Sequence, residues 1–221
     1  MSTMTRTGIA SVRQGTVLVV IDAQRAFVDP EGSVARTFGV EDVQPGADAL
    51  DRLCRFIAEH RSNGRTIFVR SEYRPGQFTG GDLNHGMANV CVPGINVDCE
   101  WASGVEITPH DIVVTKHHAD ATESAAFRAA IDRAIREGVD RIVMVGFQFT
   151  TCVAASAVST FDMVRDRGVL VSVIEALTGS RVSSYMPDAS GASRVESTRR
   201  HLQSVGVEVV AATISARQAP E

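Results

Sequence analysis

The residues best suited to chemistry lie in GFQFTTCVAASAV, residues 146–158, where a cysteine separates a strand-like run from a helix-like one. The apolar run RIVMVG, residues 141–146, is typical of a buried strand. Cys152 is therefore expected at a helix N-terminus, where unpaired backbone N–H groups and the helix dipole favour negative charge. A thiol there tends to ionise early, and the thiolate is the nucleophile. The same turn supplies N–H donors for the oxyanion of a tetrahedral intermediate.

Two further reactive side chains stand at the ends of strand-like runs. Asp22 ends VLVVID, residues 17–22, and Lys116 ends IVVTK, residues 112–116. Because sites in open parallel sheets form beyond the carboxyl ends of the strands, we expect both side chains to approach Cys152. Asp22 would take the thiol proton and later give it to a leaving amine, while the lysine holds the two anions close by charge. The cysteine would attack an amide-like carbonyl and form a thioester that water resolves.

The elements that must position these residues alternate along the chain without a compositional break. Six runs rich in β-branched residues are typical of buried strands, and four segments between them have helical spacing. The strand-like runs are residues 17–22, 66–70, 112–116, 141–146, 169–174 and 207–211, and the helical segments are residues 45–63, 122–137, 153–167 and 193–205. This alternation predicts an α/β fold, a parallel sheet covered by helices on both faces. We expect one domain over residues 15–221 after a polar tail over residues 1–14.

Length and composition restrict the classes of function. The 221 residues are 44% hydrophobic and 22% charged, which is enough apolar material for one large core. The net charge is −4 and no basic patch favours nucleic acid or an anionic membrane surface. No apolar run is long enough to cross a membrane. We expect a cytoplasmic protein with free thiols whose partner is a small-molecule substrate.

Other cysteines and histidines leave alternatives open. Cys91 and Cys99 could meet across a loop as a disulfide or as half of a metal site, although no matching second pair follows them. His117 and His118 directly follow the lysine and invite a metal interpretation. Two half-exposed imidazoles at a loop edge are the commoner reason for such a pair. Long irregular stretches over residues 72–110 and 177–192 are candidates for the loop that closes a pocket.

Three blocks, IDAQRAFVDP, VVTKHHADATESAAF and GFQFTTCVAASAV, resemble the signature blocks of the isochorismatase-like cysteine hydrolases, a family that includes nicotinamidases and N-carbamoylsarcosine amidases. The resemblance implies that Asp22, Lys116 and Cys152 form the catalytic triad. It also implies a cis peptide bond between Phe147 and Gln148, with the backbone N–H groups of Gln148 and Cys152 as the oxyanion hole. It further implies a three-layer α/β/α domain with six parallel strands in the order 3-2-1-4-5-6, and homo-oligomers whose subunits complete each other's pockets.

The chain departs from the nicotinamidase pattern after its second strand. Nicotinamidase-type members hold a metal there through an Asp-x-His motif, whereas this chain has SEYRPGQF, and Glu72 has no neighbouring histidine. We therefore expect no metal, no cofactor and a substrate other than nicotinamide. The candidate pocket residues are Gln24, Phe27, Glu72 and Phe147, with loop packing as the alternative for Gln24 and Phe27.

These observations predict a cysteine-dependent hydrolase of a small amide, carbamoyl or urea-like substrate that releases ammonia or an amine. One alternative is vinyl ether hydrolysis of the isochorismatase type, but isochorismatases proper typically lack the nucleophilic cysteine. Another is a non-catalytic thiol-sensing or scaffold protein of the same fold. The presence of both the acid and the lysine argues against it.

Overall fold

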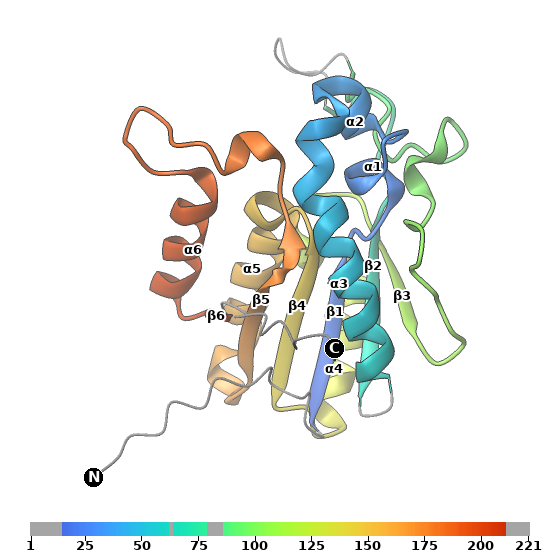
Figure 1. The fold of residues 1–221 in the computed structure, drawn as a ribbon. Helices are drawn as coiled ribbons and strands as arrows, with labels where there is room; N and C mark the ends of the chain where they lie inside the picture. The colour runs from blue at the N-terminus through green and yellow to red at the C-terminus, as the bar shows by residue number, and fades with distance from the viewer. Residues whose placement is uncertain (1–14, 62–63, 79–85, 211–221) are drawn as a thin grey trace, which may run out of the picture.

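A six-stranded, all-parallel sheet with the strand order β3-β2-β1-β4-β5-β6 forms the centre of the computed structural model (Figure 1). The strands are β1 (Thr16–Ile21), β2 (Arg65–Ser71), β3 (Ile112–Lys116), β4 (Arg141–Phe147), β5 (Leu170–Gly179) and β6 (Glu208–Val210). The predicted fold class and strand order are confirmed. The structure describes residues 15–61, 64–78 and 86–210. The predicted tail, the last residues of two predicted elements (62–63 and 211) and part of the loop over residues 72–110 lie outside these ranges.

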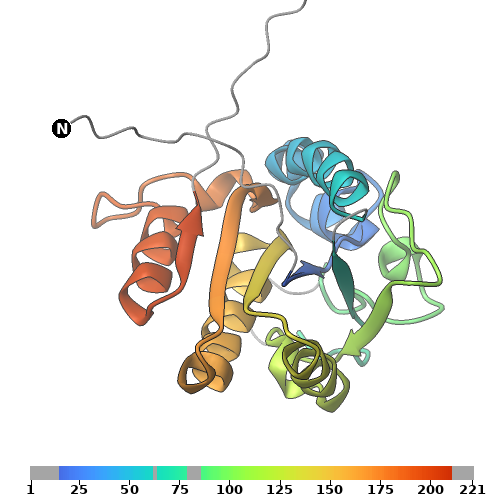
Figure 2. The same cartoon turned by 90° about the horizontal axis from the view of Figure 1, so that it is seen from below.

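Helices cover both faces of the sheet and complete three layers (Figure 2). One face carries α1 (Arg25–Val28), α2 (Ser33–Phe38) and α3 (Gln44–His60), and the other carries α4 (Ala125–Arg136), α5 (Ala154–Val164) and α6 (Arg194–Val205). Successive side chains of β1 alternate between the two cores, as the pleat of a strand requires. Val19 packs with the α4 and α5 side, whereas Leu18 and Val20 pack with the α3 side. Burial on both faces explains why this strand has a continuous apolar sequence.

Two of the helices, α3 and α6, show how the sequence fixes their position. In α3, Leu50, Leu53 and Ile57 recur at helical spacing and are buried against the sheet. The start of α6 is set by a capping box, in which Ser193 Oγ accepts the N–H of Glu196 and the Glu196 carboxylate accepts the N–H of Ser193, each at 3.1 Å. None of the helices in the described ranges combines the length and apolar character needed to cross a bilayer.

The carboxyl end of β4 lies unusually close to β1 because Gly146 has no side chain. Its φ is +107°, and a Cβ built there would lie 2.0 Å from the carbonyl oxygen of Ile21. Any other residue would clash with the neighbouring backbone and would adopt a conformation that L-residues rarely tolerate. This glycine therefore brings the turn after β4 next to the residue that follows β1.

Candidate active site

Asp22, Lys116 and Cys152 come together at the carboxyl edge of the sheet. Asp22 follows β1, Lys116 ends β3, and Cys152 lies in a π-helical turn (Phe149–Val153) that leads into α5. The Lys116 Nζ lies 2.9 Å from Asp22 Oδ2 and 3.5 Å from Cys152 Sγ. The ammonium group therefore contacts both the carboxylate and the thiol.

Burial distinguishes the three side chains. Asp22 and Lys116 are fully buried, whereas Cys152 retains 7% of its surface. Of the three residues, Cys152 is the one that retains exposed surface, and it retains only a small part. The charged pair, Asp22 and Lys116, is shielded from water. Its electrostatic interaction is therefore stronger than that of a pair at the surface.

Asp22 has a strained backbone that its neighbours hold in place. Its φ is +49°, a left-handed conformation that costs a non-glycine residue about 1–2 kcal/mol. The bond from its N–H to the Val69 carbonyl oxygen, at 2.8 Å, and the ion pair with Lys116 hold it there. Its buried Oδ2 is the oxygen that Lys116 Nζ contacts, at 2.9 Å. The carboxylate also interacts with the Cys152 thiol.

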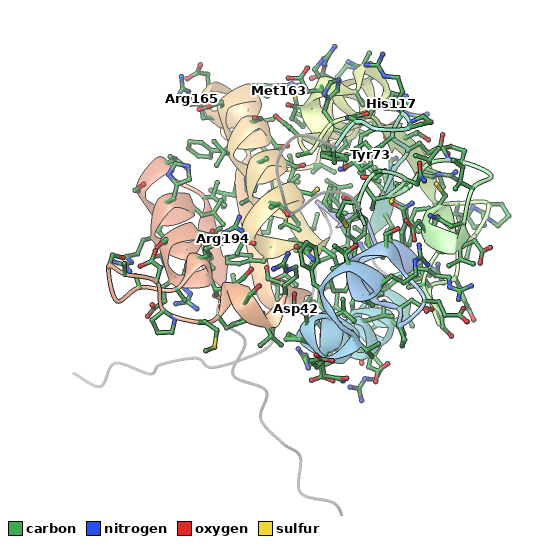
Figure 3. The ribbon with its side chains drawn as sticks, turned by 90° about the horizontal axis from the view of Figure 1, so that it is seen from above. Asp42, Tyr73, His117, Met163, Arg165 and Arg194 are labelled. Carbon is green, nitrogen blue, oxygen red and sulfur yellow. The ribbon has the colours of Figure 1, made fainter. Side chains whose placement is uncertain are left out.

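Ser71 and Tyr73, which the sequence analysis did not single out, hold Lys116 in place. Ser71 Oγ accepts a hydrogen bond from Lys116 Nζ at 2.8 Å and donates one to Asp22 Oδ1 at 3.0 Å. The Tyr73 hydroxyl lies 3.3 Å from Lys116 Nζ and 2.8 Å from Ser71 Oγ. Figure 3 looks down on this edge of the sheet and shows Tyr73 after β2 and His117 after β3, with both side chains labelled.

The alternation of side chains along β2 explains why the expected Glu72 does not join this cluster. Residues 71 and 73 point to the same side of an extended chain, and residue 72 points to the other. The Glu72 carboxylate pairs with Arg70, which shares its side. Ser71 ends β2, so the rule that selected Asp22 and Lys116, proximity to the carboxyl end of a strand, also applies to it.

The other predicted pocket residues serve the packing of the edge. Gln24 is fully buried, and its amide group brackets the backbone of Ser71, donating to the carbonyl at 3.1 Å and accepting the N–H at 2.6 Å. Phe27 and Phe147 belong to the apolar core on the α3 side, where Phe147 has no exposed surface. The structure therefore places Gln24 one contact from the cluster and the two phenylalanines in the core.

Hydrogen bonds from backbone N–H groups hold the turn between β4 and α5. The peptide bond between Phe147 and Gln148 is cis. The N–H groups of Thr151 and Val153 donate to the Gln148 carbonyl oxygen at 3.1 and 3.2 Å. The N–H of Thr150 donates to a serine hydroxyl, Ser180 Oγ, at 3.2 Å. With these amides engaged, the Gln148 and Cys152 amides remain our candidates for binding an oxyanion.

The electrostatics correct one expectation. Burial raises the pKa of the Cys152 thiol to about 11, against the opposing effect of Lys116, so the thiol does not ionise early at neutral pH. Burial lowers the pKa of Lys116, but the charges of Asp22 and Cys152 outweigh it, and the pKa lies above its ordinary value. Burial also raises the pKa of Tyr73. The helix N-terminus alone suggested a thiolate because the sequence does not reveal how deeply the sulfur is buried.

Alkylation of Cys152 by iodoacetamide tests this resting state. Because only the thiolate reacts, the rate should rise about tenfold per pH unit until the pH reaches about 11. At pH 8 it should be about a hundredfold slower than for a thiol whose pKa is 9.0. Peptide mass spectrometry of the adduct gives the rate. Alkylation at pH 8 as fast as that of an unperturbed thiol would show that the sulfur is already ionised.

Comparison with known proteins identifies the family of this chain. The Isochorismatase domain model matches residues 16–210. The chain belongs to the isochorismatase family. Comparison with curated protein sequences yields no significant match.

Solved structures of similar fold include other members of this family. An isochorismatase family protein from Desulfovibrio vulgaris subsp. vulgaris str. Hildenborough has a TM-score of 0.67 at 18% identity, over 91% of this chain and 96% of that chain. A pyrazinamidase of Pyrococcus horikoshii, in complex with zinc, has a TM-score of 0.65 at 17% identity, over 89% and 98%. A nicotinamidase/pyrazinamidase of Acinetobacter baumanii has a TM-score of 0.62 at 18% identity, over 90% and 97%. At these identities the likeness concerns the fold.

The zinc in that pyrazinamidase raises the question of whether this isochorismatase-family hydrolase has a site for a cation. Among the described residues no three His, Cys, Asp or Glu side chains lie together in a way that could hold a metal. At the end of β2, Ser71 and Tyr73 contact the Lys116 ammonium group, whose charge would repel a cation. His117 Nδ1 lies 2.6 Å from the Glu72 carbonyl oxygen, so this nitrogen is already hydrogen-bonded to the backbone. The residues that the structure describes at this edge therefore do not fit a divalent metal.

Proposed function

We propose that this isochorismatase-family hydrolase is a cysteine-dependent amidohydrolase. It cleaves a C–N bond of a small amide, carbamoyl or urea-like substrate and releases ammonia or an amine. The observation that carries the proposal is the contact of one buried lysine with both a carboxylate and a cysteine thiol. The family supports hydrolysis, and pyrazinamidases and nicotinamidases among the similar folds support an amide bond.

The first half of the reaction forms a thioester. Asp22 takes the proton of the Cys152 thiol, with which its carboxylate is hydrogen-bonded. The sulfur attacks the substrate carbonyl carbon, and the backbone N–H groups of Gln148 and Cys152 bind the resulting oxyanion. When the C–N bond breaks, Asp22 returns the proton to the leaving nitrogen. Ammonia or an amine departs, and the acyl group remains on sulfur.

The second half regenerates the enzyme. Asp22 removes a proton from a water molecule, which attacks the thioester carbonyl. The C–S bond breaks, the acid is released, and the proton returns to the sulfur. The same carboxylate therefore acts once as base and once as acid in each half.

Lys116 lowers the free energy that is needed to form the Cys152 thiolate in a buried site. A unit positive charge 3.5 Å from a thiolate stabilises it by about 5 kcal/mol at an effective dielectric constant of about 20. A thiol with a pKa of about 11 needs about 5 kcal/mol to ionise at pH 7. That pKa already includes the effect of Lys116. Without the lysine, the free energy needed to form the thiolate would be higher still. We infer that the thiolate forms only as Asp22 accepts the proton and the substrate arrives.

An ammonia-release screen over small amides, ureas and carbamoyl compounds tests the proposal. The wild-type protein should release ammonia or amine from at least one of these classes, and the Cys152→Ala protein should release none above the uncatalysed rate. Equal release by both proteins would refute the cysteine mechanism. Pyruvate release from isochorismate, with no ammonia from any amide, would replace it with vinyl ether hydrolysis.

A further inference from the structure

A second pair of thiols lies beside the catalytic cluster and takes no part in the proposed reaction. Cys91 is fully buried, and Cys99, which ends the 3₁₀ turn Val97–Cys99, is partly exposed. Both are free thiols, and Cys91 Sγ lies 3.9 Å from the carbonyl oxygen of Asp98, the residue directly before Cys99. The sequence alone left open whether these two residues meet, and the structure places them next to each other, close enough for the two thiols to influence each other's pKa.

The two thiols differ in exposure and in chemistry. The hydrogen bond from Cys91 lowers the pKa of Cys99, although burial opposes this, and the same bond together with burial raises the pKa of Cys91. Cys99 is therefore the thiol that is both more readily ionised and within reach of solvent. Cys91 is the more deeply buried of the two, and its thiol can react with an oxidised sulfur on Cys99.

The backbone around the pair is held firmly. Cys91 has a φ of +49°, a left-handed conformation that non-glycine residues adopt mainly where their surroundings impose it. Its N–H donates to Asp98 Oδ2 at 3.2 Å, and the other oxygen of this fully buried carboxylate accepts the N–H of Ser33 at 2.9 Å. Since Asp98 directly precedes Cys99, one buried carboxylate anchors the backbone beside both cysteines.

Each cysteine also supports a residue that belongs to the active site. The carbonyl oxygen of Cys91 accepts the N–H of Tyr73 at 2.9 Å. The carbonyl oxygen of Cys99 accepts Gln24 Nε2 at 3.4 Å, and Gln24 brackets the backbone of Ser71. Because Tyr73 and Ser71 both contact Lys116, two short hydrogen-bonded paths connect the thiol pair with the catalytic lysine.

We propose that Cys91 and Cys99 form a reversible disulfide on exposure to a hydroperoxide, and that this bond lowers the reactivity of the catalytic cluster. The Cys99 thiolate attacks one peroxide oxygen and the O–O bond breaks, which gives a sulfenic acid and, after protonation, an alcohol or water. The Cys91 sulfur then displaces hydroxide from Cys99, and its proton leaves with the hydroxide as water. The two sulfurs together lose two electrons and the peroxide gains them. A dithiol reverses the reaction by exchange.

The effect on the active site follows from the hydrogen bonds. A covalent bond joins the two sulfurs, and the backbone carbonyl groups of Cys91 and Cys99, which hold Tyr73 and Gln24, shift with them. Lys116 then loses part of its fixed position beside Cys152. Because Lys116 lowers the pKa of the Cys152 thiol, its displacement leaves the sulfur less reactive at a given pH. Lower amidohydrolase activity also follows, a part of the inference that rests on the proposed function.

Treatment of the protein with hydrogen peroxide tests the disulfide without any substrate. Peptide mass spectrometry should show the loss of two hydrogen atoms from the segment that holds Cys91 and Cys99, reversed by dithiothreitol. The single tryptophan, Trp101, lies close by and packs edge-on against Phe68, with ring centroids 5.6 Å apart, so its fluorescence should change with oxidation. Cys99→Ser should abolish both signals. Cys54→Ser, which removes another partly exposed cysteine, should leave both intact.

The coupling is tested by the alkylation rate of Cys152 in the oxidised and reduced protein. We expect oxidation to slow alkylation by iodoacetamide at a fixed pH by about tenfold, since small displacements of positioning groups have effects of this size or larger. Cys99→Ser should show no such change. Oxidation of either cysteine without a disulfide, or a disulfide that leaves Cys152 alkylation unchanged, would overturn the proposal. If the disulfide slows alkylation but no amide is ever hydrolysed, only the proposed function fails.

Discussion

Turnover of the accepted amide should fall by about 10⁴-fold or more in Cys152→Ala, the loss that removal of a nucleophile from a cooperating set of residues produces. The protein should remain folded, because the side chain is small and retains 7% of its surface. Ammonia release under saturating substrate gives the turnover number, and thermal unfolding reports the fold. The expected shift in stability is about 1 kcal/mol, as for removal of one buried group.

Cys54→Ala is the matched control for this result. Cys54 lies on α3 and is partly buried, and it has no role in the proposed reaction. It should retain wild-type turnover. A Cys152→Ala protein that keeps more than about a tenth of wild-type turnover would rule out the thioester route, because the remaining groups cannot replace a nucleophile.

Lys116→Met should lose both activity and stability. The substitution keeps much of the side-chain volume but leaves the Asp22 carboxylate fully buried without its cationic partner. Breaking a buried ion pair from one side typically costs about 3–5 kcal/mol. Urea unfolding should show a loss of that order in the free energy of unfolding, and turnover should be undetectable because nothing stabilises the thiolate.

The double variant Asp22→Asn with Lys116→Met separates the two effects. It buries no charge, so it should recover most of the stability lost in Lys116→Met while it remains inactive. Such non-additivity is expected for side chains in direct contact. A Lys116→Met protein within about 1 kcal/mol of wild-type stability would contradict the buried ion pair.

Much of the sheet could be predicted because strands covered on both faces have continuous apolar sequences. The run over residues 112–116 coincides with β3. The convergence of Asp22, Lys116 and Cys152 followed from one general rule about the carboxyl edge of parallel sheets. It required no knowledge of the side-chain contacts.

The second half of β5 could not be predicted. The apolar run stops at Ile174, but the strand continues to Gly179 with a shift of register against β4. A charged residue, Glu175, lies inside the strand because Arg199 of α6 binds its carboxylate through two hydrogen bonds of 2.6 and 2.7 Å. A partner 24 residues away on another element leaves no local signal in the sequence.

The site itself was only partly visible in the sequence. Ser71 and Tyr73 are ordinary residue types, and their role depends on the path of the Lys116 side chain across the end of β2. The raised pKa of Cys152 depends on burial that tertiary packing creates. Short helices such as α1 and α2, of four and six residues, are too brief to show a helical period.

The most direct test of the account is the intact mass of the protein after acid quench during turnover of an accepted amide. The account predicts a population whose mass is increased by the acyl part of the substrate, located on Cys152 by peptide mapping and absent from Cys152→Ala. Sustained turnover with no acyl adduct at any time, and with no hydroxamate when hydroxylamine is added, would contradict covalent catalysis by this sulfur.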